Sequence, residues 1–274
     1  MNNQKVFRFL QLFLCLHTYM LSAQKINLSA ELNEVSGLTW CQGQLLAIND
    51  GGNQPILFFL DTTGKITHQS LITNAVNIDW ESITHDSTGN LYIADCGNNL
   101  NDRNEIQVYK VSLQKASTSS DIVAESCTVT IPYPERPLST NQLDFDFEAM
   151  NWENGKLWFY SKSRAKPWHG KTYSYQLEWR QGTSEVILSS EVFIGRGGWM
   201  KDAVTGSCSL SNSTVLLTYK KLYLINEGKV TLLKRFHGWR QREGVAIDDR
   251  QRMYVVSERT IFHRNPKMEI VHIK

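Results

Sequence analysis

The chain has 274 residues, of which 41% are hydrophobic, 11% aromatic and 20% charged. Its 29 Lys and Arg nearly balance its 27 Asp and Glu, which excludes a polybasic nucleic-acid binder, so nucleic acid is not an expected partner. Six Pro and 17 Gly are too few for a low-complexity chain. The length allows one or two domains, and a β-barrel or propeller of this size would count as one.

Residues 1–23 have the pattern of a cleaved signal peptide. Lys5 and Arg8 form a positive start, an apolar stretch covers 9–21, and Ser22-Ala23 offers small residues at the cleavage point. The apolar run is shorter than the ~20 residues of a membrane span. We therefore expect an exported protein that is not an integral membrane protein. It would be periplasmic or extracellular, and association with the outer membrane is one option. Residues 24–274 would form its single domain.

Four cysteines lie beyond the signal peptide, at Cys41, Cys96, Cys127 and Cys208. An even number in an exported protein permits disulfides, with three connectivities open. No CxxC pair occurs, and the spacings match no zinc site. Disulfides and buried free thiols both remain as interpretations.

Short apolar runs separated by turn residues recur along the rest of the chain, and no window of twelve or more residues has a convincing helical stripe. This pattern is typical of an all-β protein. The expected strands are, in chain order, 44–48, 56–60, 66–71, 90–94, 106–113, 126–133, 156–160, 172–179, 186–194, 215–219, 221–225, 229–236, 252–256, 260–263 and 268–273.

A sequence pattern recurs five times in the chain. It runs from a polar residue, through a small and an aliphatic residue, to a polar or aromatic residue 14 positions later, and it starts at Ser36, Glu81, Glu148, Thr205 and Glu243. Each copy leaves room for two more strands, which gives four strands in about 50 residues, the size of a propeller blade. We therefore predict a single β-propeller of four-stranded blades, with five blades, or six if a degenerate blade lies in 104–144 or 165–200. A strand near 25–28 is expected to close the ring against the C-terminal strands.

The repeat predicts which side chains face the central channel, because the first strand of each blade lines it and alternate residues point inward. Carboxylates gathered there would repel one another unless they were protonated, neutralised by bases or bound to a cation. Hard divalent cations prefer oxygen ligands, so Ca²⁺ or Mg²⁺ is the expected cofactor. The predicted metal ligands are Glu81, Glu148, Glu243, Asp50 and Asp95, and the other predicted channel-lining residues are Glu34, Asp79, Asp146, Lys162, Thr205, Arg103, Gln241 and Glu258.

Two other interpretations of these acids stay open. They could hydrogen-bond the backbones of neighbouring blades and hold the ring together, or they could form acid/base pairs for catalysis. No GxSxG, HExxH or P-loop motif accompanies them.

Several motifs along the chain match a known family pattern in order. They are Glu34-Val-Ser-Gly-Leu, Asp79-Trp-Glu-Ser-Ile, Asp95-Cys-Gly-Asn-Asn, Asp146-Phe-Glu-Ala-Met and Gln241-Arg-Glu-Gly-Val. In this arrangement the chain resembles a family of exported bacterial propellers related to SdiA-regulated proteins and phytase-like esterase propellers. The resemblance covers nearly the whole chain after the signal peptide and implies a propeller fold. It also implies calcium binding, which some relatives show.

Three functional hypotheses follow. The favoured one is an exported binding or interaction propeller, with a small-molecule or cell-envelope partner, whose acidic channel holds a divalent cation or small ligand. The second is a metal-dependent hydrolase of an ester, lactone or phosphoester, in which the cation polarises substrate and water. The third is a passive scaffold whose loops, with Trp168, Trp199 and Trp239, bind protein or glycan.

Overall fold

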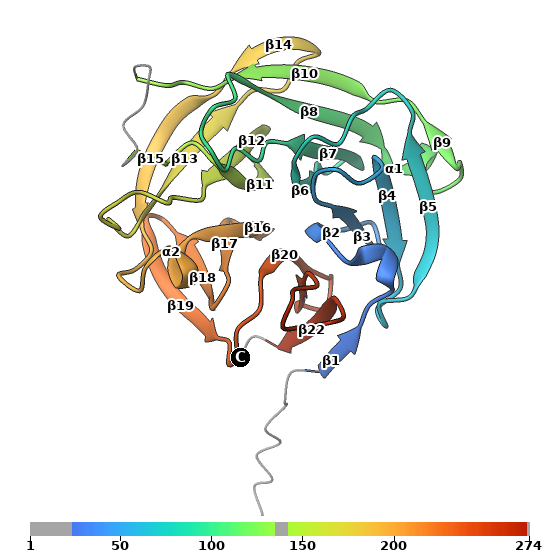
Figure 1. Cartoon of the computed structure of the whole chain (residues 1–274). Helices are drawn as coiled ribbons and strands as arrows, with labels where there is room; N and C mark the ends of the chain where they lie inside the picture. The colour runs from blue at the N-terminus through green and yellow to red at the C-terminus, as the bar shows by residue number, and fades with distance from the viewer. Residues whose placement is uncertain (1–23, 135–141, 273–274) are drawn as a thin grey trace, which may run out of the picture.

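The computed structural model of the protein describes residues 24–134 and 142–272, so the predicted signal peptide lies outside the described residues. The described chain forms five β-sheets arranged as blades around a common axis (Figure 1). The inner strands contact one another in the ring order β2, β6, β11, β16, β20 and back to β2. This confirms the predicted all-β fold with five blades.

Each blade is built from strands that follow one another outward from the axis. Blade 1 contains β2 (Val35–Cys41), β3 (Gln44–Asn49), β4 (Ile56–Leu60), β5 (Ile66–Ile72) and β9 (Asp121–Ile122). Blade 2 contains β6 (Trp80–His85), β7 (Asn90–Asp95), β8 (Glu105–Ser112), β10 (Glu125–Thr130) and β14 (Gly182–Glu185). Blade 3 contains β11 (Phe147–Glu153), β12 (Lys156–Ser161), β13 (Lys171–Leu177) and β15 (Ile187–Phe193).

Blades 4 and 5 complete the ring. Blade 4 contains β16 (Val204–Leu210), β17 (Ser213–Thr218), β18 (Lys221–Asn226) and β19 (Lys229–Arg235). Blade 5 contains β20 (Arg242–Ile247), β21 (Arg252–Ser257), β22 (Lys267–His272) and, outermost, β1 (Gln24–Asn27). Helical turns in the described chain are short: η1 (Ala30–Leu32), α1 (Leu113–Ala116) and α2 (Trp199–Asp202). None of the helices in the described ranges has the length and apolar character needed to cross a bilayer.

The last blade differs from its predicted strand order. β1 pairs antiparallel with β22, which confirms that the N-terminal strand closes the ring. The predicted strand 260–263 is wrong, because the structure has only one isolated bridge there, between Thr260 and His263. The C-terminal strand is therefore third in its blade, and the N-terminus supplies the fourth.

Two blades carry a fifth strand that the repeat did not predict. β9 pairs parallel with β5 at the edge of blade 1, and β14 pairs parallel with β10 at the edge of blade 2. β9 lies in the chain between β8 and β10 of blade 2, and β14 between β13 and β15 of blade 3, so each reaches back from the following blade. They cover backbone groups that an open sheet edge would leave unpaired.

The apolar core of the described chain lies between the blades as five clusters, one at each interface between neighbouring sheets. Strand β7 shows how one sequence serves two interfaces. Leu91 and Ile93 face the cluster toward blade 1, whereas Tyr92 and Ala94 face the cluster toward blade 3. Because side chains alternate along a strand, an apolar run is needed where both faces are buried.

The four described cysteines are free thiols, so the disulfide alternative is not realised. Cys41, Cys96 and Cys127 are buried. The Cys96 thiol donates to the Phe147 carbonyl at 3.0 Å, which links blades 2 and 3.

A buried ion pair within blade 5, whose arginine also bonds blade 4, gives the first test of the fold. Arg242 Nε and Nη2 lie 2.9 and 2.7 Å from Glu269 Oε1, while Nη1 donates to the Tyr219 carbonyl at 2.9 Å. Glu269→Ala leaves this guanidinium buried without its anion, so we expect the free energy of unfolding in urea to fall by about 3–5 kcal/mol. Glu125→Ala, which breaks an exposed pair with Lys110, should have a much smaller effect. Equal effects of the two variants would contradict this account.

Candidate metal centre

The inner strand of every blade carries a β-bulge at the same repeat position. The register between the inner and second strands shifts once in each blade, and the residues skipped are Ser36, Glu81, Glu148, Thr205 and Glu243. These are the five residues at which the sequence pattern starts. A bulge leaves its residue out of the ladder and changes the direction of its side chain. The five copies of the sequence pattern therefore mark the β-bulges of the five inner strands.

Two of the five bulge residues bind the neighbouring blade. The Ser36 hydroxyl donates to the Trp80 carbonyl at 2.6 Å, and the Thr205 hydroxyl donates to the Arg242 carbonyl at 2.6 Å. Each bond joins the inner strands of two blades. Thr205, predicted to line the channel, is thus occupied by an inter-blade bond. The other three bulge residues are glutamates.

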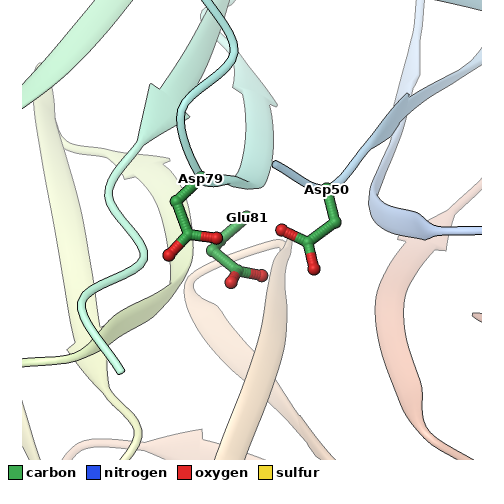
Figure 2. A group of neighbouring side chains, drawn as sticks. All are labelled: Asp50, Asp79 and Glu81. Carbon is green, nitrogen blue, oxygen red and sulfur yellow. The ribbon is translucent and has the colours of Figure 1, made fainter. Parts of the chain in front are cut away.

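One of these glutamates lies in a close group of three carboxylates. Each of Asp50, Asp79 and Glu81 offers an oxygen atom, and the three oxygens lie within 4.8 Å of one another (Figure 2). Asp50 directly follows β3, Asp79 directly precedes β6, and Glu81 occupies the bulge of β6. Asp50 and Glu81 were predicted as metal ligands, whereas Asp79 was predicted only to line the channel. Such a group could hold a metal ion.

The backbone around Asp79 is held by the loop that follows β7. The Asp79 carbonyl accepts a hydrogen bond from the Gly97 N–H at 3.1 Å. A Cβ on Gly97 would lie 2.3 Å from the Asp79 carboxyl carbon, so only glycine leaves room for this carboxylate. Asp95 accepts from the N–H groups of Ile78 and Asp79 at 3.0 and 3.2 Å and pairs with Arg103 at 2.8 Å. Asp95 and Arg103 therefore position the segment that carries Asp79.

Hydrogen bonds of its backbone N–H and carbonyl hold Asp50 in place. Its N–H donates to the Glu34 carbonyl at 2.8 Å, and its carbonyl accepts from the Asn77 side chain at 2.9 Å. A Cβ on Gly51 would lie 2.2 Å from the Ile78 carbonyl oxygen, so this glycine permits blades 1 and 2 to approach closely here. The Glu34 carboxylate is bound to Asn53 at 2.7 Å.

A second group at the axis contains the only Lys among the predicted channel residues. Lys162 Nζ lies 2.6 Å from Glu148 Oε1, and both side chains are buried. The other carboxylate oxygen of Glu148 is buried without a hydrogen-bond partner in the described structure. Burial opposes the charge of Lys162, but Glu148 and other nearby acidic groups outweigh it and raise its pKa well above the usual value.

The remaining predicted residues surround these two groups. Burial raises the pKa of Glu243, and Lys162, Gln241 and Tyr219 oppose this rise. Burial and the charges of Glu243 and Asp50 raise the pKa of Glu258 to about 9. Asp146 accepts from the Asn98 N–H at 2.7 Å and lies 3.7 Å from Arg164.

Burial and mutual repulsion also act on the three-carboxylate group. The pKa of Asp50 is raised by burial, and that of Glu81 is raised well above its usual range by burial and by the charges of Glu148 and Asp50. Burial, a hydrogen bond shared with Asp50 and the charge of Asp50 raise the pKa of Asp79 to about 7. The group therefore resists full ionisation unless a positive charge joins it.

Two residues near these groups were not among those predicted from the sequence. Tyr219 lies 14 positions after Thr205, the interval that selected Asp50 and Lys162, so the repeat contained the signal for it. Its ring centroid lies 5.5 Å from Lys162 Nζ. Arg164, which lies near Asp146 and 5.7 Å from the Trp199 ring centroid, had no such signal, because it stands outside the repeat.

Comparison with known proteins supports the fold and nothing finer. The sequence matches no protein-family model and no curated protein sequence. Glutaminyl cyclase from Myxococcus xanthus is a similar solved structure, with a TM-score of 0.53, 11% identity, and coverage of 90% of this chain and 94% of that one. Aldose sugar dehydrogenase from Escherichia coli has a TM-score of 0.52, 11% identity, and coverage of 92% and 100%. A putative gluconolactonase has a TM-score of 0.50, 10% identity, and coverage of 88% and 76%.

The raised pKa of Asp79 gives a pH-dependent prediction for the cation-free protein. Between about pH 4 and 7 the folded state keeps a proton that the unfolded state releases, so the free energy of unfolding falls as pH rises through this window. Asp79→Asn removes the ionisable group and with it this loss of stability at higher pH. In EDTA its stability relative to wild type should therefore increase from pH 5 to pH 8, by about 2 kcal/mol after allowance for solvent screening.

Urea unfolding at both pH values measures this difference. Asp121→Asn, at an exposed strand position, is the matched control and should follow the wild-type profile. Parallel pH profiles for Asp79→Asn and wild type would show that burial and neighbouring charges do not raise the pKa of Asp79.

Proposed function

We propose that the protein is an exported binding propeller, of the kind related to SdiA-regulated proteins, and that one Ca²⁺ at its axis forms the core of the binding site. Asp50, Asp79 and Glu81 are the proposed protein ligands. The observation that carries the proposal is the convergence of these three carboxylates within 4.8 Å of one another.

The chemistry of the group favours a cation over a purely structural role. Glu81 is 4% exposed, and no hydrogen bond or ion pair reaches its carboxylate from the rest of the described chain. A buried carboxylate without a partner is costly, and a bound cation removes that cost. Lys162, the nearby buried base, is paired with Glu148.

Calcium is the proposed ion for a geometric reason. Oxygens on opposite sides of one Ca²⁺ stand about 4.6–5.2 Å apart, and the ion accepts irregular arrangements of six to eight oxygens. Magnesium needs shorter contacts in near-ideal octahedral geometry. Three carboxylates leave coordination positions for water or for oxygen atoms of a small ligand, which is how the cation would serve binding.

The hydrolase hypothesis requires the same cation, whereas the passive scaffold requires none. Cation binding therefore separates the first two hypotheses from the third. The fold is shared with proteins named as cyclases, dehydrogenases and lactonases, but at 10–11% identity this likeness does not assign an activity.

Titration of EDTA-treated protein with CaCl₂ tests the proposal. We expect one Ca²⁺ per chain by calorimetry, and a thermal stabilisation worth about 2.7 kcal/mol when free Ca²⁺ is 100 times Kd. Affinity should be weaker at pH 5.5 than at pH 7.5, because protons then compete for Asp79, whose pKa is about 7. MgCl₂ should bind more weakly.

Glu81→Gln keeps the size of the side chain and removes its charge, so we expect Ca²⁺ affinity to fall at least 100-fold. Glu191→Gln, at an exposed position on β15, is the matched control and should bind as wild type does. Absence of both binding heat and thermal stabilisation with Ca²⁺ would overturn the proposal, as would Ca²⁺ binding that Glu81→Gln leaves unchanged.

A further inference from the structure

A second cavity, which we call the distal cavity, lies at the other end of the inner strands. The acidic group stands where these strands begin, whereas the distal cavity is lined by residues where they end and by the turns that follow. Its volume is about 500 Å³, within the range of small-molecule sites. Every blade contributes to its lining, which includes Thr39, Trp40, His85, Trp152, Ser207 and Asp248.

Two of the three carboxylates that line the distal cavity, those of Asp86 and Asp248 but not of Asp249, are already used by the fold. The Asp86 carboxylate accepts hydrogen bonds from Thr88, Asn90 and the Tyr92 hydroxyl within its own hairpin. Asp248 accepts in the same way from its own hairpin, including the Tyr254 hydroxyl at 3.1 Å. The lining residues of the described chain include no Lys or Arg. An anionic ligand would therefore meet acids and no lysine or arginine.

What the distal cavity offers instead is hydroxyl groups. Six Ser and Thr side chains line it, namely Thr39, Thr84, Ser87, Ser207, Ser209 and Ser211. The Ser207 hydroxyl is buried and has no hydrogen-bond partner in the described structure. The His85 ring is held through Nδ1, which lies 3.0 Å from the Thr39 hydroxyl.

Two indole rings in the lining each stack on a tyrosine of a neighbouring blade. Trp40 stacks on Tyr254 with a centroid distance of 6.1 Å and an interplanar angle of 3°. Trp152 stacks on Tyr92 at 5.0 Å and 10°. Both tryptophans are half-buried. Rings fixed in this way present rigid apolar surface with little loss of conformational entropy on binding.

We propose that the distal cavity binds a small neutral carbohydrate, a mono- or disaccharide. The apolar C–H faces of a sugar ring match the indole rings, and its hydroxyl groups match the Ser and Thr lining. A neutral polyol also needs neither the lysine nor the arginine that an anion would require. This site is separate from the proposed Ca²⁺ site and does not depend on it.

Calorimetry and tryptophan fluorescence with glucose, N-acetylglucosamine, maltose and cellobiose test the proposal. We expect saturable binding of at least one of these sugars, with Kd in the millimolar range or tighter. Trp152→Phe and Ser207→Val should each weaken it at least five-fold. Trp158→Phe is the matched control, because Trp158 is another half-buried indole of blade 3 that lies outside the distal cavity, and it should change nothing.

Sugar binding can be tested separately from Ca²⁺ binding. Sugar binding should persist in EDTA and in Glu81→Gln, so failure of the Ca²⁺ proposal would leave it intact. If Trp152→Phe does not fold, Ser207→Val alone decides. Absence of saturable binding by any of the four sugars would overturn the proposal, as would sugar binding that both cavity variants leave unchanged. Tight binding of phosphate or tetramethylammonium in place of the sugars would overturn the proposed ligand class.

Discussion

In each blade the inner strand is interrupted by a bulge at one residue, and this irregularity decides which side chains meet at the axis. Where the bulge holds Ser36 or Thr205, the side chain joins two blades by a hydrogen bond. Where it holds Glu81, Glu148 or Glu243, ring closure buries a carboxylate beside others, and the pKa of each is raised. Lys162 offsets part of that repulsion at Glu148, whereas the three-carboxylate group retains it.

Much of this arrangement could be predicted from the sequence, because the repeat is local. A bulged strand, a tight turn and a second strand lie within 15 residues, so the five copies are visible without tertiary information. The two fifth strands are different, since they depend on where segments of the following blade pass. Similarly, the sequence could not show that Asp79 joins the three-carboxylate group while Asp95 holds its backbone. These roles depend on Gly97, Arg103 and the backbone of Ile78.

The two ends of the channel have opposite chemistry. One end gathers carboxylates whose oxygens have few donors, while at the other the carboxylates of Asp86 and Asp248 are saturated by their own hairpins. The same residue type is thus available for a ligand at one end and structural at the other. Hydrogen-bond saturation, and not the presence of an acid, distinguishes the two cases, and sequence alone does not reveal it.

We propose that the bulge at Glu81 and the segments carrying Asp50 and Asp79 create one cation site. A crystal structure of the protein grown in CaCl₂ tests this most directly, with anomalous scattering used to identify the ion. We expect one Ca²⁺ with oxygens of Asp50, Asp79 and Glu81 at 2.3–2.6 Å. A calcium-saturated crystal in which these carboxylates hold only water or one another would contradict it.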